Sequence, residues 1–433
     1  MRRFGLLFIL MFLELAIWGA WLPIAQTYFQ GQTPAGLGFN GTQLGLLFAL
    51  MPACSIVMSP LFGQLADRVF NSEKMLAVLH LLSAVSLFAL SRQTTFAGTF
   101  ICLLIHCILF SPTVALSNSV VLHHLDDPAK QFGNIRVAGT IGWMVSGWLM
   151  YALRASGKVQ IVGDLFVVAA ALSILLGIIC FFVPKTPPSK VDSNKYAFGA
   201  ALKLMNNSNF MMLMIVSLLI CTQFDFFYMF TPGYLTAPTK ETLAGILPQS
   251  YIGAGGYGLG VMPKQVPLIM SFAQVSEVVL MLCLPFLLRN LGYKWTIYLG
   301  IIAWFLRFAI YVFFASFFAT MVSIMLHGFC IACFMIGGSL YVAKVAPANI
   351  RASAQALYSI ITYGFGRVIG AIVGGYIQTI NTTALPVRLP LPGTNDLDKL
   401  VNWQAIFAIP TGMTFVCVLA FPFLFRPKKS ELD

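Results

Sequence analysis

The chain has 433 residues, of which 59% are hydrophobic and 9% are charged, and its formal net charge is +12. Soluble domains carry about 25% charged residues, so this composition excludes a water-soluble fold and indicates an integral membrane protein. The basic residues fall in short segments between apolar runs, which is typical of topology signals, so we expect no nucleic-acid partner.

Apolar runs long enough to cross a lipid bilayer recur along the whole chain. They predict an all-α membrane protein with twelve transmembrane helices. The first run is too long for a signal-peptide core and is interpreted as a retained span. The predicted spans are 5–29, 42–66, 74–92, 97–121, 134–154, 162–183, 209–234, 266–288, 294–315, 318–343, 352–379 and 403–425.

One long polar segment near the middle separates six spans from the other six. It predicts an N-terminal six-helix bundle at 1–183, a cytoplasmic linker at 184–208 and a C-terminal six-helix bundle at 209–433. Lysine and arginine are more than twice as frequent in the loops on the linker's side as in the opposite loops. This bias predicts that both termini lie in the cytoplasm.

Ionisable residues inside the spans are costly in hydrocarbon, so they pair with one another or face a water-filled cavity. Arginine opens the fifth span, where Arg136, Thr140 and Trp143 share one helical face at i, i+4 and i+7. A cation, a hydroxyl and a flat ring suit a polar ligand with a stackable plane. The alternative is that Arg136 snorkels to the interface. The ionisable set is Glu14, Arg136, Asp225, Glu277, Arg307 and Arg367.

The eighth span carries Gln274 and Glu277 three residues apart, again on one face. A glutamine amide both donates and accepts hydrogen bonds, and a carboxylate accepts them from hydroxyls. The seventh span adds Gln223, Asp225 and Tyr228 as cavity candidates. Asp225 has a structural alternative, as the partner of Arg307.

Three further sets of residues have mainly structural interpretations. Glu14 shares a face with two tryptophans and is either a site residue or part of an interface anchor. Arg307 and Arg367 are interpreted as structural. Glycines spaced by four in the eleventh span predict close helix packing; they are Gly366, Gly370 and Gly374.

No set of residues in the sequence suits enzymatic chemistry. The nine cysteines all fall in apolar runs, so no disulfide framework is expected. No nucleophile–base pair, metal cluster or cofactor loop is recognisable. We therefore expect no enzyme activity, no metal and no cofactor.

Several segments resemble known transporters. Gly63 to Arg68, "GQLADR", is similar to the signature loop of the major facilitator superfamily. Five further segments, in order along the chain, resemble the bacterial nucleoside:proton symporters of that superfamily. They are "WGAWL" at 18–22, "IRVAGTIGW" at 135–143, "SFAQVSEVVLMLCLPF" at 271–286, "AWFLRF" at 303–308 and "IRASAQ" at 350–355.

The resemblance implies a major facilitator fold that imports nucleosides by proton symport and alternating access, as a monomer in the bacterial inner membrane. It places Arg136, Thr140, Trp143, Gln274 and Glu277 at the substrate site. Alternatives are a facilitator or symporter for a sugar or another small polar solute, and a non-transporting membrane sensor. Purine or pyrimidine preference is left open.

The tenth span departs from the family in one important respect. The family places an acidic residue in its middle after an aromatic one, and these positions fall here on Ile331 and Ala332. A proton carrier must change charge, and a buried Asp or Glu is the usual means. We therefore expect Asp225 to be the displaced coupling group, with Glu277 as the next candidate. The alternative is that coupling is lost.

Overall fold

The computed structural model describes residues 2–32, 36–157, 163–188, 197–247, 256–347, 350–389 and 397–427. The chain forms two compact units, the first made of 1–192 with 261–271 and the second of 193–260 with 272–433. The predicted bundles and linker, at 1–183, 184–208 and 209–433, stay a prediction because residues 189–196 lie outside the described part.

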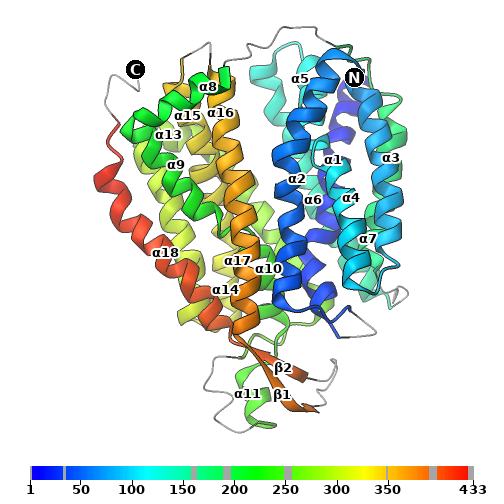
Figure 1. The fold of residues 1–433 in the computed structure, drawn as a ribbon, viewed down its shortest axis with the longest axis vertical. Coiled ribbons are helices and arrows are strands. Elements are labelled where there is room, and N and C mark those ends of the chain that lie inside the picture. The colour runs from blue at the N-terminus through cyan, green and yellow to red at the C-terminus, as the bar shows by residue number, and fades with distance from the viewer. Residues whose placement is uncertain are drawn as a thin grey trace. The chain divides into compact units, whose positions relative to one another are not determined.

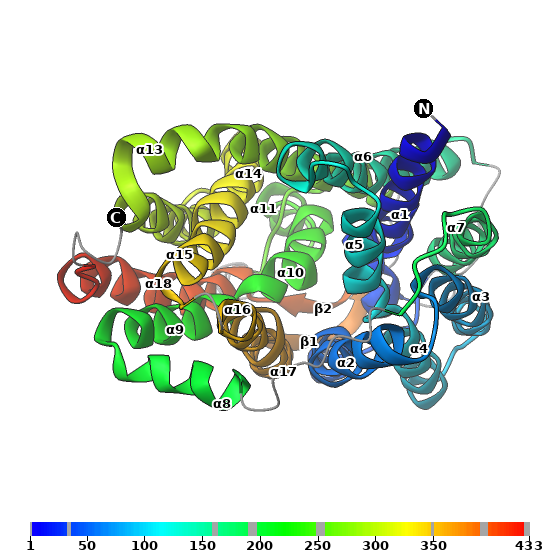
Figure 2. The same cartoon turned by 90° about the horizontal axis from the view of Figure 1, so that it is seen from above.

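The first unit is a bundle of helices that lie side by side (Figure 1). Viewed from above, α1 lies beside α5 and α6 (Figure 2). The span formed by α4 and α5 is interrupted at Ser111 and Pro112. The helices are α1 (Arg2–Gln30), α2 (Gly41–Arg68), α3 (Ser72–Leu90), α4 (Phe96–Phe110), α5 (Thr113–His123), α6 (Pro128–Ala155) and α7 (Asp164–Cys180).

The second unit is also helical, with a small two-stranded sheet. Its elements are α8 (Ala197–Leu202), η1 (Lys203–Asn206), α9 (Ser208–Cys221), α10 (Phe224–Thr236), α11 (Lys240–Ala244), α13 (Val266–Phe313), α14 (Phe317–Met325), η3 (Phe329–Ile336), α15 (Gly337–Val345), α16 (Arg351–Ser359), η4 (Ile360–Gly366), α17 (Arg367–Ile380), β1 (Thr382–Leu389), β2 (Leu397–Val401) and α18 (Trp403–Leu424). The short helix η2 (Pro263–Gln265) precedes α13; η2 and the start of α13, up to residue 271, belong to the first unit, and the rest of α13 belongs to the second.

Helix ends follow from local sequence. Asn40 accepts from the Gln43 backbone N–H while the Gln43 side chain accepts from the Asn40 N–H, a capping box that starts α2. Within α13, Gly292 has a φ of 72° and a non-helical conformation, which only glycine adopts readily. This residue separates the predicted eighth and ninth spans without an intervening loop.

Each of the twelve predicted spans corresponds to a helix or to joined helices among the described residues. Nine helical stretches there are long and apolar enough to cross a membrane, and one of them, 263–313, contains both helices flanking Gly292. The remaining two spans are α6 and the shorter helix α7. The predicted fold class is confirmed.

The tenth and eleventh spans are not uniform α-helices. Each contains a π-helical segment, η3 in the tenth and η4 in the eleventh, and such segments are frequent at functional sites. Ala332, the position at which the resemblance implies an acid, is buried within η3.

The glycine spacing of the eleventh span allows close packing, as predicted. A Cβ at Gly366 would lie 2.8 Å from the Cβ of Cys221, and one at Gly374 would lie 2.8 Å from the ring of Phe226. A Cβ at Gly370 would overlap the backbone carbonyl of Thr222. These glycines therefore let the eleventh span approach the seventh closely.

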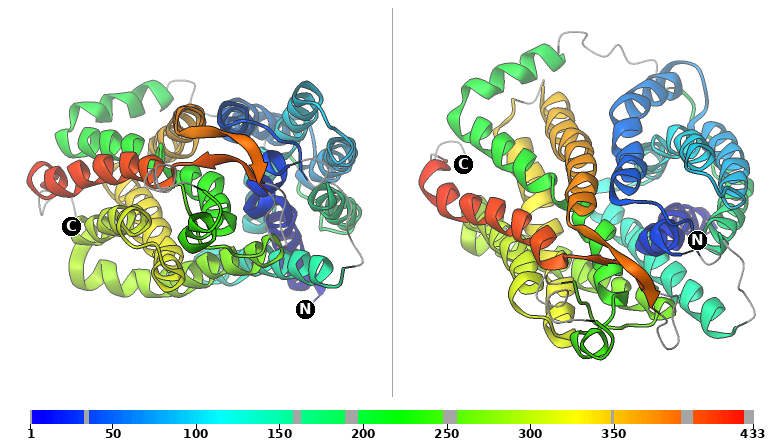
Figure 3. Two further views of the ribbon diagram at one scale, coloured as in Figure 1. Left: turned by 90° about the horizontal axis from the view of Figure 1, so that it is seen from below. Right: turned by 60° about the horizontal axis from the view of Figure 1, so that its bottom comes forward.

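The small sheet was not predicted from the sequence. Strands β1 and β2 pair antiparallel, with Thr382 opposite Val401 and Ala384 opposite Lys399. They follow α17 directly and lie near α11 (Figure 3). Leu243 of α11 packs against Leu400 of β2, with Leu247, Tyr257 and Leu385 around them.

Candidate functional site

In the first unit, the predicted stripe lies on α6. Thr140 and Trp143 are buried and Arg136 is half-buried. Within the described residues of the first unit, no carboxylate oxygen lies within 4 Å of the Arg136 guanidinium. Arg136 is therefore not neutralised by an ion pair in this part of the chain, which leaves its donors for a ligand.

Aromatic rings of α1 continue this stripe. Trp18 meets Trp143 edge-on, with ring centroids 5.6 Å apart, and meets Phe110 at 6.2 Å. The indole nitrogen of Trp18 is buried and has no hydrogen-bond partner within the described structure. Trp18 is thus half-buried against the candidate stripe and does not have the setting of an interface anchor.

In the second unit, Tyr228 of α10 and Gln274 of α13 lie together. Both are buried, and the Gln274 amide nitrogen donates to the Tyr228 hydroxyl over 3.4 Å. The amide oxygen of Gln274 is buried and has no partner among the described residues. A buried amide oxygen without a donor is costly, so this atom is suited to accept from a ligand N–H.

Glu277 lies one turn beyond Gln274 and close to a histidine. Its Oε2 is 3.7 Å from His327 Nε2, and His327 is buried while Glu277 is half-buried. The His327 ring stacks on Phe227 at 5.3 Å and meets Tyr228 edge-on at 6.2 Å. The structure therefore brings Tyr228, Gln274 and Glu277 together, with His327 added.

Asp225 does not belong to this cluster. Its two carboxylate oxygens accept from Arg367 Nη2 at 2.6 Å and Arg367 Nε at 3.0 Å, and both residues are buried. The structural alternative named Arg307 as the partner, and that pairing is wrong. Asp225 and Arg367 lie on α10 and α17, which pack directly on one another.

The other two candidates of the second unit have different surroundings. Gln223, at the junction of α9 and α10, is buried; its amide nitrogen donates to the Leu219 carbonyl at 3.4 Å, and its amide oxygen is unpartnered among the described residues. Arg307 is fully buried with its guanidinium 3.7 Å from the centre of the Phe227 ring. This cation–π contact agrees with the structural interpretation of Arg307.

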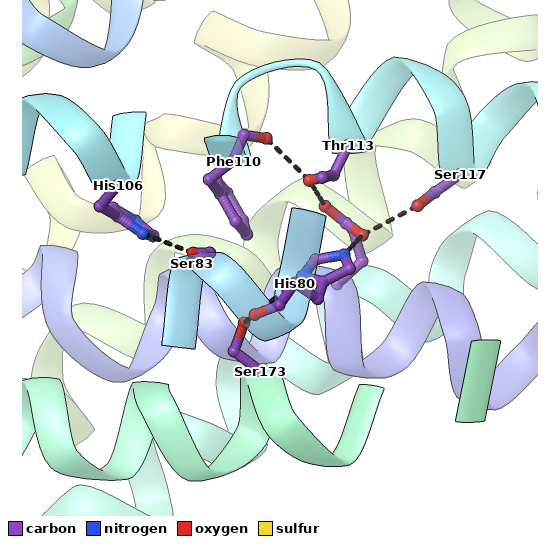
Figure 4. A network of polar contacts seen from close by, with 8 residues as sticks. His80, Ser83, His106, Phe110, Thr113, Ser117 and Ser173 are labelled. Atoms are coloured by element: carbon purple, nitrogen blue, oxygen red, sulfur yellow. Dashed lines mark hydrogen bonds and ion pairs between the residues drawn. The ribbon is translucent and has the colours of Figure 1, made fainter. Parts of the chain in front are cut away.

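Glu14 is not exposed as an interface anchor would be, and within the described part of the chain no hydrogen bond or ion pair joins it to a candidate substrate residue. It is fully buried and bonds to Thr113, Ser117 and His80 (Figure 4). Sequence reasoning missed this set and also missed His327. Both could have been found by counting histidines, as well as Asp, Glu and Arg, among the ionisable residues inside apolar spans.

Metal binding has no support in the described part of the chain, where no three His, Cys, Asp or Glu side chains cluster as ligands. All described cysteines are free thiols. The side chains gathered in each unit are hydrogen-bonding and aromatic, which suits reversible binding of a polar ring compound.

Comparisons with known proteins agree along the full chain. A family model described as "Nucleoside H+ symporter" matches residues 1–430. YegT of Escherichia coli K12 is 29% identical over 448 residues, covering 100% of this chain and 96% of YegT. Nucleoside permease NupG of the same organism is 27% identical over 433 residues, covering 97% of this chain and 95% of NupG.

Solved structures give the same result. The crystal structure of nucleoside transporter NupG matches with a TM-score of 0.79 and 27% identity, over 99% of this chain and 100% of that chain. A mutant of the same transporter matches with a TM-score of 0.82 and 26% identity, over 98% of this chain and 100% of that chain.

Proposed function

The chain belongs to the nucleoside H+ symporter family, and from that premise we propose that it imports nucleosides with protons by alternating access. It is a multi-pass membrane transporter and not an enzyme. The loop charge bias favours an orientation with both termini in the cytoplasm, and the bacterial relatives favour an inner-membrane location. Lys185 is exposed, so the variant Lys185→Cys tests this orientation. The new thiol should not react with a membrane-impermeant thiol reagent added outside the cell, and reaction would contradict the orientation.

In the first unit, the α6 stripe supplies one set of ligand contacts. Arg136 donates charge-assisted hydrogen bonds, Thr140 donates or accepts one, and Trp143 packs against the base. The support is that Arg136 lacks an ion-pair partner among the described residues while its neighbours on the stripe are buried.

In the second unit, the observation that carries the proposal is the buried, unpartnered amide oxygen of Gln274 beside Tyr228 and Glu277. An amide edge that donates and accepts matches the complementary edge of a nucleobase. Glu277, which is half-buried, accepts from ribose hydroxyls. Asp225 is a weaker candidate for the substrate because both its carboxylate oxygens are bonded to Arg367. Gln223 also has an amide oxygen without a partner among the described residues, but no other predicted site residue is bonded to it there.

Asp225 and Glu277, the two acids predicted as proton carriers, differ in the groups that surround their carboxylates. Protonating Asp225 would leave the Arg367 guanidinium unpaired in a buried position, which is strongly unfavourable. Glu277 is half-buried, with its Oε2 3.7 Å from His327 Nε2, so it can exchange a proton with water more readily than the fully buried Asp225. Within the second unit, Glu277 is therefore the better candidate.

Uptake of labelled nucleosides into cells that lack nucleoside transporters tests the function. We expect accumulation above the outside concentration, because proton symport can drive uphill movement, and we expect an uncoupler to abolish it. Uptake that is insensitive to the uncoupler would assign facilitated diffusion in place of symport. No uptake of any purine or pyrimidine nucleoside would reject nucleosides as the cargo.

Substrate binding is tested on three residues. Arg136→Ala, Gln274→Ala and Glu277→Ala should each weaken nucleoside binding about 10- to 100-fold while the protein still reaches the membrane. Each change removes a hydrogen bond to a charged or buried group, worth roughly 1.5–3 kcal/mol. Titration calorimetry on the purified variants measures the loss.

Two variants away from the candidate site serve as matched controls. Arg92 is exposed, and Gln404 bonds the Tyr257 hydroxyl at 3.2 Å. Arg92→Ala and Gln404→Ala should leave nucleoside affinity unchanged. Wild-type affinity in all three site variants would place the binding site elsewhere.

A further inference from the structure

The first unit contains a buried acid that the proposed site does not use. Glu14 of α1 accepts from Thr113 at 2.6 Å and from Ser117 at 2.8 Å, and its Oε2 lies 3.1 Å from His80 Nε2 (Figure 4). Among the described residues, no lysine or arginine nitrogen lies within 4 Å of its carboxylate. The pair of Glu14 and His80 thus lacks a permanent countercharge.

The hydrogen bonds around Glu14 Oε1 are compatible with a proton bound to that oxygen. The Thr113 hydroxyl lies 2.7 Å from the Phe110 carbonyl as well as 2.6 Å from Glu14 Oε1. A hydroxyl has one hydrogen, so with an ionised Glu14 it can serve both oxygens only through a shared, three-centre bond. With Glu14 protonated on Oε1, the acid donates to Thr113 and Thr113 donates to Phe110, and each contact is then a full hydrogen bond.

The histidine offers a second place for the same proton. Oε2 accepts from Ser117 and from His80 Nε2–H, which leaves His80 Nδ1 without a hydrogen in the neutral ring. The Ser173 hydroxyl donates to the His80 carbonyl at 2.9 Å, and its oxygen lies 3.5 Å from Nδ1. A proton on Nδ1 would therefore find an acceptor in Ser173.

The neighbouring titratable groups do not neutralise the pair. His106 of α4 bonds the Ser83 hydroxyl at 2.8 Å, and the Cys180 thiol is buried on α7. Within the described residues, α2, α5 and α6 bring no ion-pair partner to Glu14. When Glu14 is ionised and His80 neutral, the buried pair carries one negative charge, and a single proton removes it.

We propose that Glu14 and His80 bind the transported proton, which leaves Glu277 to the substrate; this rests on the proposed symport. The proton enters from water, resides on Glu14 Oε1 or His80 Nδ1, and leaves to water on the other side. Removing the buried charge lowers the cost of reorienting the bundle in lipid.

A contiguous set of contacts joins this pair to the candidate substrate stripe. Thr113 begins α5, directly after the break that follows Phe110. The Phe110 ring packs on Trp18 at 6.2 Å, and Trp18 meets Trp143 at 5.6 Å. When Glu14 is protonated, the Thr113 hydroxyl donates to the Phe110 carbonyl alone. Protonation therefore changes a hydrogen bond of Phe110, whose ring contacts Trp18 and, through Trp18, Trp143.

The test uses the purified full-length protein in liposomes, with labelled uridine and adenosine as probes. Glu14→Gln keeps the hydrogen bonds of the protonated acid but cannot release a proton. We expect it to retain counterflow exchange and to lose accumulation driven by an imposed pH gradient. Accumulation by Glu14→Gln equal to that of wild type would overturn the proposal.

A milder variant keeps the test decisive if Glu14→Gln does not fold. Ser117→Ala removes a hydrogen bond to Glu14 Oε2, so accumulation driven by the pH gradient should fall roughly 3- to 10-fold relative to counterflow exchange. Ser86→Ala, which deletes a hydroxyl bonded to the Cys102 carbonyl in the same bundle, should leave this ratio unchanged. An unchanged ratio in Ser117→Ala would contradict the assignment.

Failure of the symport itself has a different signature. A wild-type protein that exchanges nucleosides but never accumulates them under a pH gradient would reject proton symport. A wild-type protein that accumulates them, together with a Glu277→Gln variant that binds normally but does not accumulate, would assign the proton to Glu277. The Glu14 assignment stands only if wild type accumulates and Glu14→Gln does not.

Discussion

Asp225→Asn should lower the free energy of unfolding by about 3–5 kcal/mol, the usual cost of leaving one member of a buried ion pair unpaired. The carboxylate of Asp225 accepts both hydrogen bonds of a bidentate contact with Arg367, at 2.6 and 3.0 Å, and both residues are buried. Thermal unfolding of the variant in detergent, followed by tryptophan fluorescence, measures the loss.

The double variant Asp225→Asn/Arg367→Met is the matched control. It removes both charges and should be more stable than the single variant, because no uncompensated cation remains. If Asp225→Asn were as stable as wild type, the ion pair would contribute nothing and a transport role for Asp225 would return. If Asp225→Asn is less stable than wild type and also loses transport, the loss of folded protein explains the loss of transport.

Gly370→Val should destabilise the second unit by about 3 kcal/mol or more, at or above the upper end for overpacking. Any Cβ at this position overlaps the backbone carbonyl of Thr222, and backbone cannot rotate away as a side chain can. The fraction of monodisperse protein after extraction, read by size-exclusion chromatography, should fall sharply.

Gly412→Ala is the control for Gly370→Val. Gly412 lies inside α18, and a Cβ there would meet nothing within 4 Å. This variant should extract normally, and the better helix propensity of alanine should make it slightly more stable. Normal extraction of Gly370→Val would show that the eleventh span can move away from α9 and α10.

Features that depend on local sequence could be predicted. Span positions follow from run length and hydropathy, and the helices agree with them even where α13 continues past Gly292. The spacing of Gly366, Gly370 and Gly374 indicated close packing because side-chain size alone decides how near two backbones approach. The sequence segments shared with the symporters indicated the family that the full-length match confirms.

Features that depend on tertiary partners could not be predicted. Asp225 and Arg367 are 142 residues apart, and composition gave no reason to prefer Arg367 over Arg307. Glu14 meets His80 and Thr113 across three helices, and the spacing along α1 suggested only a tryptophan stripe. The π-helical segments and the β1–β2 pair likewise arise from packing around them.

The strands β1 and β2, with α11, form a described cluster of regular structure that is not part of a span. Leu243 and Leu400 hold this cluster together through a small apolar core. A surface with fixed backbone geometry loses little conformational entropy when an antibody fragment binds it, and most of this transporter is covered by lipid or detergent. The cluster therefore offers an attachment point for a fragment that would add recognisable mass for particle alignment in electron cryomicroscopy.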